Sequence, residues 1–225
     1  MKFALIPFLA LVLNSAPSLL ADQPPVPSGE GKEMVAADLS NVEAPTGVWK
    51  VENGELTANA DQVVWLAGEH ENYLLDLEFK NAEGTNSGVI IHCTDTKKWI
   101  PNSIELQIAD PFAEKWAKSA PTWHGGGVFG RLAPAKQMTK RPGEWNRMLV
   151  LAKGRQIKVW LNGELTADMD MDKWKEVKKN PDGSDIPGWL SKPAATMPAK
   201  GRIGLQGKHG DATVWFRNVR LYPAP

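Results

Sequence analysis

The sequence predicts an all-β protein, a sandwich of two antiparallel sheets with short helices in its loops. Many short apolar runs follow one another, and turn residues such as Asn-Gly separate them. The chain lacks long stretches with the 3.6-residue period of an amphipathic helix, and only residues 112–118 and 171–178 suit short helices. The 225 residues, 42% hydrophobic and 23% charged, fit a single globular domain.

The first 21 residues have the pattern of a secretory signal peptide. Lys2 precedes an apolar run at 3–13, and residues 14–21 are small or polar enough for a cleavage region that ends at Ala21. The run is too short for a transmembrane anchor. We expect a linker at 22–33, a single domain at 34–225, and a periplasmic or secreted protein without membrane association after cleavage.

The first strands are expected between residues 49 and 79. Residues 49–51 and 55–57 flank Glu52-Asn53-Gly54, and Asn-Gly accepts positive φ, which predicts a hairpin. Residues 63–66 form a third run. Residues 73–79 alternate, so their odd-numbered members share one apolar face.

Seven further runs predict the remaining strands. Asn162-Gly163 supplies a tight turn among them, and residues 180–200 form a long irregular segment of a kind that often carries function. The runs, in chain order, are 89–93, 104–109, 148–152, 156–161, 164–166, 202–206 and 213–221.

The last run changes parity along its length. Val214 and Phe216 have even numbers, whereas Val219 and Leu221 have odd ones. If all four face the core, one extra residue lies between them, which predicts a β-bulge at Arg217-Asn218. The alternative is one straight face of odd-numbered residues.

Composition limits the partners. The formal net charge is zero, so neither nucleic acid nor an anionic membrane is favoured. Ten tryptophans are compatible both with stacking on sugars and with a tryptophan-rich core. Cys93 is the only cysteine, which excludes an intramolecular disulfide, and a small buried side chain is a better interpretation than a reactive thiol.

Two neighbouring runs carry polar residues where a structural strand would gain more from valine or threonine. In the second run Glu105 and Gln107 share one face, opposite Ile104 and its apolar neighbours. His92 lies on the preceding run and could reach Glu105 across the sheet. These residues suggest a polar cleft. The alternatives are a solvated sheet face for the first pair and a satisfied, half-buried histidine at 92.

Seven motifs follow one another along the mature chain. They are Trp49-Lys50-Val51-Glu52-Asn53-Gly54-Glu55-Leu56, Asn86-Ser87-Gly88-Val89, Glu105-Leu106-Gln107-Ile108-Ala109-Asp110, Gly127-Val128-Phe129-Gly130, Lys140-Arg141-Pro142-Gly143-Glu144-Trp145-Asn146, Val159-Trp160-Leu161-Asn162-Gly163, and Gly204-Leu205-Gln206 to His209-Gly210 with Trp215-Phe216-Arg217-Asn218-Val219. Each alone is weak, but together they resemble the 3-keto-disaccharide hydrolases, long catalogued as a domain of unknown function. The family often has arginine at the position of His92 and tyrosine at that of Phe129.

The resemblance implies a concanavalin A-like jelly roll whose concave face binds a small oligosaccharide or glycoside. It implies catalytic roles for Glu105, His92, His209 and Arg217, the last of which could instead be a surface arginine paired with an acid such as Asp110. Further residues are expected to bind substrate: Asn86, Gln107, Asp110, His124, Trp145 and Gln206.

The implied chemistry is elimination. A ketone at carbon 3 of the sugar acidifies the hydrogen on carbon 2, a base removes it, the substituent on carbon 1 leaves, and water adds back. Either Glu105 or His92 is expected to be the base. The enolate oxygen is expected to contact Arg217, His209 or a bound divalent cation, although no cofactor is fixed by the sequence.

The sequence is also compatible with two other functions. The first is a non-catalytic carbohydrate-binding module of the same fold. The second is a glycosidase with two carboxylates, but the sequence pairs no second acid clearly with Glu105. Calcium at Asp168, Asp170 and Asp172 is conceivable, but the glycine and distal glutamate of a helix-loop-helix site are missing.

Overall fold

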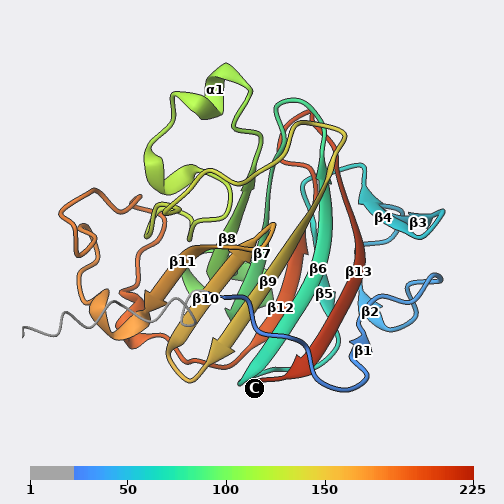
Figure 1. Cartoon of the computed structure of the whole chain (residues 1–225), viewed down its shortest axis with the longest axis horizontal. Coiled ribbons are helices and arrows are strands. Elements are labelled where there is room, and N and C mark those ends of the chain that lie inside the picture. Colours follow the sequence, from blue (N-terminus) through green and yellow to red (C-terminus); the bar gives the residue numbers. More distant parts are fainter. Residues whose placement is uncertain (1–22) are drawn as a thin grey trace, which may run out of the picture.

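In the computed structural model, which describes residues 23–225, two antiparallel sheets pack face to face (Figure 1). The expected signal peptide, residues 1–21, lies outside the described residues. The expectation of an all-β sandwich is confirmed. Within the described part of the chain, helices long and apolar enough to span a membrane are absent.

The larger sheet has eight strands in the order β11-β10-β9-β6-β13-β4-β3, with β1 also paired to β13. The expected hairpin at Asn53-Gly54 joins β3 to β4, and both turn residues have positive φ. The strands are β1 (Lys32–Glu33), β3 (Trp49–Glu52), β4 (Glu55–Ala58), β6 (Tyr73–Asn81), β9 (Trp145–Lys153), β10 (Gln156–Leu161), β11 (Glu164–Asp170) and β13 (Val214–Pro223).

The smaller sheet has five strands in the order β2-β5-β12-β7-β8. They are β2 (Val42–Glu43), β5 (Val63–Leu66), β7 (Asn86–Cys93), β8 (Ile104–Ala109) and β12 (Arg202–Gln206). The helices are single turns in the loops: α1 (Glu114–Ala117) and the 3₁₀ turns η1 (Thr96–Lys98), η2 (Ile100–Asn102), η3 (Pro121–Trp123), η4 (Met171–Lys173) and η5 (Ala194–Thr196).

Three boundaries differ from the sequence-based expectations. The segment expected to be a linker ends in strand β1, where Lys32 pairs with Leu221 of β13. The helix expected at 112–118 is the single turn α1. The one expected at 171–178 is only the 3₁₀ turn η4, because Trp174 already has a non-helical backbone.

The core lies between the sheets and is built by alternation along each strand. In β6, Leu75, Leu77 and Phe79 are buried and face the smaller sheet, which contributes side chains such as Leu106 and Ile108. Each fully buried side chain of this size stabilises the fold by roughly 1.5–3 kcal/mol. The inner faces of both sheets are therefore apolar, and any site must lie on an outer face.

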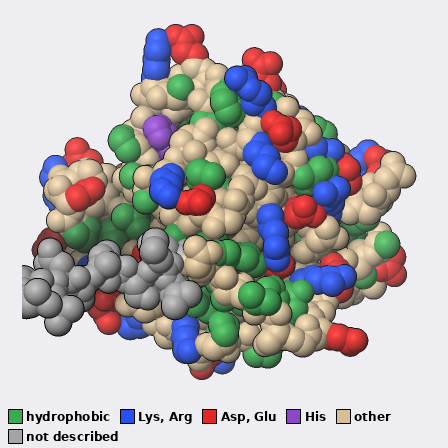
Figure 2. Space-filling model, in the orientation of Figure 1, with side chains coloured by type: hydrophobic (Ala, Val, Ile, Leu, Met, Phe, Trp, Pro, Cys, Tyr) green, Lys and Arg blue, Asp and Glu red, His purple; other side chains and the backbone are tan. Residues whose placement is uncertain are grey.

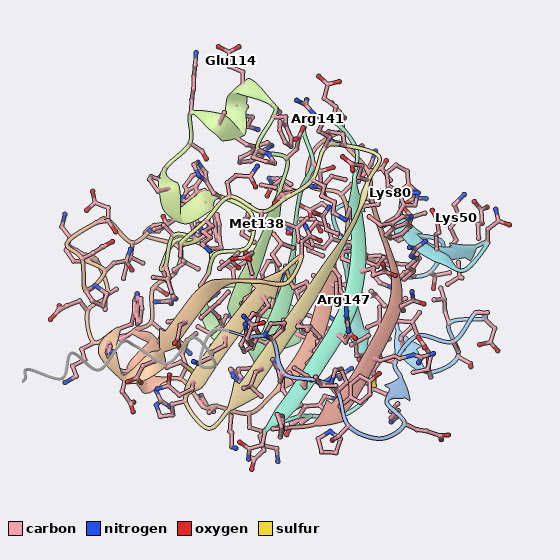
Figure 3. All side chains as sticks on the ribbon, in the orientation of Figure 1. Lys50, Lys80, Glu114, Met138, Arg141 and Arg147 are labelled. Carbon is pink, nitrogen blue, oxygen red and sulfur yellow. The ribbon has the colours of Figure 1, made fainter. Side chains whose placement is uncertain are left out.

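The outer face of the larger sheet is covered by charges. Figure 2 shows basic and acidic side chains interspersed over it, and Lys80 and Arg147 in Figure 3 lie over this sheet. Arg147 pairs with Asp76, and the ammonium of Lys80 lies over the rings of Trp145 and Trp215. Side chains there satisfy one another across strands, as expected of a solvated sheet face.

The predicted bulge in the last strand is confirmed. The pairing of β13 with β6 shifts register between Arg217 and Arg220, and Asn218 has a φ of 52°. The extra residue lets Phe216 and Val219 both face the core, where they are 0% and 1% exposed.

A second bulge corrects the expectation for His92. The register of β12 against β7 shifts where Arg202 opposes Cys93 and Gly204 opposes Ile90, and His92 has a φ of 53°. The left-handed backbone conformation at His92 turns the imidazole into the sandwich, where its ring centroid lies 6.4 Å from that of Tyr73. The expectation that His92 shares a face with Glu105 is therefore wrong.

Candidate active site

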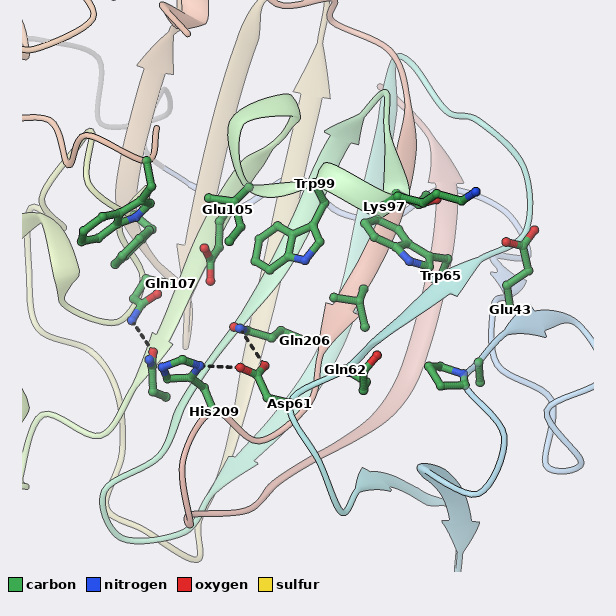
Figure 4. A pocket seen from close by; sticks show the side chains of 18 of the residues that line it. Glu43, Asp61, Gln62, Trp65, Lys97, Trp99, Glu105, Gln107, Gln206 and His209 are labelled. Atoms are coloured by element: carbon green, nitrogen blue, oxygen red, sulfur yellow. Dashed lines mark hydrogen bonds and ion pairs between the residues drawn. The ribbon is translucent and has the colours of Figure 1, made fainter. Parts of the chain in front are cut away.

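A cleft of about 1200 Å³ lies over the outer face of the smaller sheet (Figure 4). The polar side chains of its centre come from strands β7, β8 and β12 and from the segments that precede β5 and follow β12. Five of them are residues that the sequence analysis selected. The group consists of Asp61, Asn86, Glu105, Gln107, Gln206 and His209.

Glu105 projects from β8 over the neighbouring strand. A methyl group on Gly88 of β7 would lie 2.7 Å from Cγ of Glu105, so only glycine leaves room for this carboxyl. Among the described residues, none donates a hydrogen bond to it. Burial, and secondly the charge of Asp61, raise the pKa of Glu105 to about 8. Glu105 is therefore mainly protonated at neutral pH.

His209 and Asp61 form a hydrogen-bonded pair beside Glu105. Nδ1 of His209 lies 2.5 Å from Oδ2 of Asp61, and Nε2 of Gln206 donates to Oδ1 of the same carboxylate at 3.1 Å. Both Asp61 oxygens are thus engaged, which fixes the imidazole and leaves its Nε2 without a partner among residues 23–225. A carboxylate on Nδ1 is the arrangement that orients a histidine general base.

Asn86 joins the two halves of the cluster. Its carbonyl oxygen accepts the backbone N–H of His209 at 3.1 Å, and its Oδ1 accepts Nε2 of Gln107 at 2.9 Å. Oε1 of Gln107 remains buried and without a partner in the described structure, although the residue lines the cleft. A buried acceptor of this kind is costly unless a ligand hydroxyl donates to it.

The motif Asn86-Ser87-Gly88 thus has a local explanation. Asn86 holds Gln107 and the loop of His209, while Gly88 makes space for Glu105. The hydroxyl of Ser87 donates to the backbone oxygen of Gln206 at 2.7 Å, which holds β7 to β12 beneath the cleft.

Aromatic side chains form the two sides of the cleft. On the β5 side, Trp65 lies over Gly204, where a methyl group would be 2.8 Å from the indole ring, and Trp99 packs beside it. Beyond β8, the ring of Trp123 lies 5.5 Å from Phe129 and 6.1 Å from Trp189. These residues line the cleft, so several tryptophans are available for stacking and do not only fill the core.

Asp110 and His124 do not line the cleft, in contrast to the expectation that they bind substrate. Asp110 is fully buried, and its carboxylate accepts the backbone N–H groups of Gly84 and Phe112, which stabilises the turns beside β7 and β8. His124 follows η3 and donates its backbone N–H to Pro121.

Arg217 and Trp145 lie on the opposite sheet. Arg217 donates to Glu78 at 2.9 Å, and its guanidinium stacks on Trp145 at 3.9 Å. The alternative of a surface arginine paired with an acid is correct in kind, but the acid is Glu78. Neither residue can reach a ligand in the cleft, because the sandwich core separates the two outer faces.

His92 lies outside the cleft as well. Burial, and secondly the charge of Arg155, lower the pKa of His92 to about 4, so the ring is neutral. Both ring nitrogens are buried without hydrogen-bond partners in the described structure. Cys93 is buried, and burial raises the pKa of its thiol to about 11, in agreement with an inert side chain.

Sequence reasoning missed Asp61. It lies in the turn before β5, and its partner His209 follows β12, which pairs with β5. The pairing of β5 with β12 is the signal that could have revealed Asp61. In an antiparallel pair, the residue that precedes one strand and the residue that follows its partner lie at the same end of the pair.

A divalent cation has few donors here. Among residues 23–225, no three His, Cys, Asp or Glu side chains converge in a way that could hold a metal ion. Asp168 pairs with Lys158 and Asp172 with Arg155, while Asp170 accepts the backbone N–H of Asp172. The residues of the cleft do not fit a metal site, and we assign no step to one.

Comparisons with known proteins agree with the fold. A family model described as a 3-keto-alpha-glucoside-1,2-lyase-like domain matches residues 30–222. A crystal structure of a candidate glycosyl hydrolase from Parabacteroides distasonis is 48% identical, with a TM-score of 0.83, over 86% of this chain and 98% of that one.

More distant structures share the fold alone. A second candidate glycosyl hydrolase from the same organism is 21% identical over 83% of this chain and 90% of its own, with a TM-score of 0.65. The carbohydrate-binding module CBM66 from Bacillus subtilis is 12% identical over 84% and 99%, with a TM-score of 0.51. No curated protein matches the sequence. The expected jelly-roll fold is thus confirmed.

Proposed function

This chain belongs to the 3-keto-alpha-glucoside-1,2-lyase-like family, and from that premise we propose that it cleaves 3-keto-glycosides by elimination, followed by hydration. One observation carries the proposal: a carboxyl group that is protonated at neutral pH shares a cleft with a histidine oriented by a carboxylate. That combination provides an acid and a base at the same pH, which elimination requires.

His209 is the proposed base. Its Nε2 removes the hydrogen from carbon 2 of the sugar, which the ketone at carbon 3 makes acidic. Asp61 stabilises the imidazolium that forms and keeps Nδ1 as the proton-bearing nitrogen. This assignment replaces His92, which faces the core, and leaves Glu105 for a different role.

Glu105 is the proposed acid. As the enolate collapses, the ketone re-forms, a double bond forms between carbons 1 and 2, and the bond from carbon 1 to the leaving oxygen breaks. Glu105 donates its proton to that oxygen, so the products are a 3-keto enone and an alcohol. Oε1 of Gln107, the buried acceptor without a partner, receives a hydrogen bond from a sugar hydroxyl.

Hydration reverses the proton transfers. Glu105, now a carboxylate, takes a proton from water, the resulting hydroxide adds to carbon 1, and the imidazolium of His209 returns a proton to carbon 2. The sum of the two stages is hydrolysis of the glycosidic bond, and both residues regain their starting protonation states. We propose that the enzyme acts in the periplasm or outside the cell, where the expected signal peptide would direct it.

One observation favours a second candidate, an ordinary glycosidase. Asp61 provides the second carboxylate that the sequence did not reveal, and its charge acts on Glu105. Such an enzyme uses one protonated and one ionised carboxyl group. Against it, both oxygens of Asp61 are engaged by Gln206 and His209, so neither is free to attack a sugar.

The test compares a 3-keto-α-glucoside with the parent glucoside that has a hydroxyl at carbon 3. The proposal expects alcohol release from the ketone only, and loss of that release in Glu105→Gln and His209→Ala. Equal release from both compounds would indicate the glycosidase. Binding of either compound without any release would indicate a non-catalytic carbohydrate-binding module.

A further inference from the structure

The cleft is asymmetric about Glu105. Its volume of about 1200 Å³ exceeds the 300–1,000 Å³ typical of small-ligand pockets, so it has room for more than one ring. On the β5 side the lining combines Trp65 and Trp99 with the amide of Gln206 and the His209–Asp61 pair. On the other side, beyond β8, three aromatic residues form what we name the aromatic notch: Trp123, Phe129 and Trp189.

We infer that the aromatic notch binds the leaving group, and that the preferred substrates carry a planar aromatic aglycone. This inference rests on the proposed function, because it takes Glu105 as the acid that protonates the leaving oxygen. The backbone N–H of Phe129 donates to the backbone oxygen of Glu105 at 2.9 Å, so the notch begins directly beside the strand that carries the acid.

The rings of the notch are inclined to one another. Trp123 makes an angle of 46° with Phe129 and 59° with Trp189, at centroid distances of 5.5 and 6.1 Å. Inclined rings form a recess, whereas a single open ring forms a flat platform for the face of a sugar. A planar ring placed against this recess makes offset and edge-to-face contacts with its walls, the arrangements that aromatic pairs prefer.

The notch is held in place by the loop that carries Trp189. A methyl group on Gly130 would lie 2.7 Å from Leu190, so glycine allows this loop to pack against the turn after Phe129. Arg131 donates to the backbone oxygen of Lys192 at 2.9 Å, which ties the same two segments together. Trp189 is nevertheless 52% exposed, so packing of the core does not account for its position.

The polarity of the lining distinguishes an aromatic ring from a second sugar. Among the described residues that line the cleft beyond β8, Lys115 alone has a charged or amide side chain. Its ammonium lies 4.7 Å from the centroid of the Trp116 ring. A second sugar would leave most of its hydroxyls without partners there, at a cost in affinity. An aromatic aglycone has no such requirement.

Benzyl and methyl 3-keto-α-glucosides provide the test, because their leaving alcohols have similar acidity and differ in the ring. We expect wild-type kcat/KM to favour the benzyl substrate by about tenfold, the effect of one well-formed aromatic contact. In Trp189→Ala and Phe129→Ala that ratio should fall close to one. In Trp99→Ala, the matched control on the other side, both substrates should lose rate equally.

Three outcomes would overturn the inference. The wild type could show no preference for the benzyl substrate, or Trp189→Ala could leave that preference unchanged. The third is a preference for a 3-keto-disaccharide over the benzyl substrate that is lost in Trp189→Ala. Cleavage of neither substrate would contradict the proposed function instead. The notch would then be tested by saturation-transfer NMR with unoxidised benzyl α-glucoside. If the saturation of the phenyl protons is lost in Trp189→Ala, the result supports binding of the ring in the notch. If the substitution leaves the saturation unchanged, the inference is overturned.

Discussion

Oδ2 of Asp61 lies 2.5 Å from Nδ1 of His209, although 148 positions separate the two residues in the chain. Strands β5 and β12 bring them together, because Asp61 precedes one and His209 follows the other. The pair lies beside Glu105 at the floor of the cleft (Figure 4). This relationship supports the proposed role of His209 as the base, because it fixes the orientation of the imidazole and leaves Nε2 for the substrate.

Asp61→Asn should lower kcat for a 3-keto-α-glucoside by about a hundredfold with little change in KM, because general-base catalysis contributes at least that factor. His209→Ala should lose at least as much, and the double variant should be no worse than His209→Ala, since the residues act as a unit. The control is Asp211→Asn, an exposed carboxylate of the same segment. Additive losses in the double variant would contradict a shared role.

Glu105→Gln should stabilise the fold at alkaline pH while it abolishes turnover. The pKa of Glu105 rises from an ordinary 4.5 to about 8 on folding, so its contribution to stability is present below pH 4.5 and is lost as pH rises through 8. Removing the charge should raise the free energy of unfolding at pH 8 by on the order of 2 kcal/mol, allowing for partial exposure to the cleft.

Urea unfolding at pH 4.5 and pH 8 measures this difference, with Glu52→Gln in the β3–β4 hairpin as the exposed control. Equal stabilities of wild type and Glu105→Gln at both pH values would mean that Glu105 has an ordinary pKa, which would contradict its role as the acid at neutral pH.

Gly88→Ala should reduce turnover by tenfold or more, because the added methyl group meets Cγ of Glu105 at 2.7 Å and displaces its carboxyl. Gly188→Ala is the matched control, since a methyl group there has nothing within 4 Å. Steady-state kinetics and the midpoint of thermal unfolding should be measured together. A Gly88→Ala enzyme with wild-type kcat would show that the position of Glu105 does not matter.

His92→Leu should keep activity and make the protein more resistant to acid. The pKa of His92 falls from an ordinary 6.5 to about 4 on folding, so the fold loses stability as pH falls from 6.5 through 4. The full loss is about 3 kcal/mol. Unfolding followed by circular dichroism between pH 7 and 4 should show a smaller decline in the variant than in wild type. His70→Gln, at a partly exposed histidine, should decline like wild type; the idea fails if His92→Leu does the same.

Some of these relationships could be predicted from sequence because they depend on local alternation. Parity placed Glu105 and Gln107 on the face opposite Ile104, and the change of parity near the C-terminus located the bulge at Arg217-Asn218. In both cases apolar and polar residues alternate clearly, and alternation is the property that a strand face imposes on a sequence.

The bulge at His92 could not be predicted in the same way. Residues 89–91 are all apolar, because one face of β7 packs in the core and the other lies beneath the cleft, so an extra residue leaves no change of pattern. The assignment of Trp145 and Arg217 failed for another reason. Their alternation was visible, but whether a strand joins the larger or the smaller sheet depends on long-range pairing, which the sequence pattern does not contain.

The most direct test of the central claim is incubation with a 3-keto-α-glucoside in D₂O, followed by proton NMR of the sugar product. Elimination and hydration break and re-form the bond between carbon 2 and hydrogen, so the released 3-keto sugar should carry deuterium at carbon 2, beyond the exchange measured without enzyme. Asp61→Asn should slow alcohol release and incorporation equally. Complete alcohol release with hydrogen retained at carbon 2 would contradict the proposed mechanism.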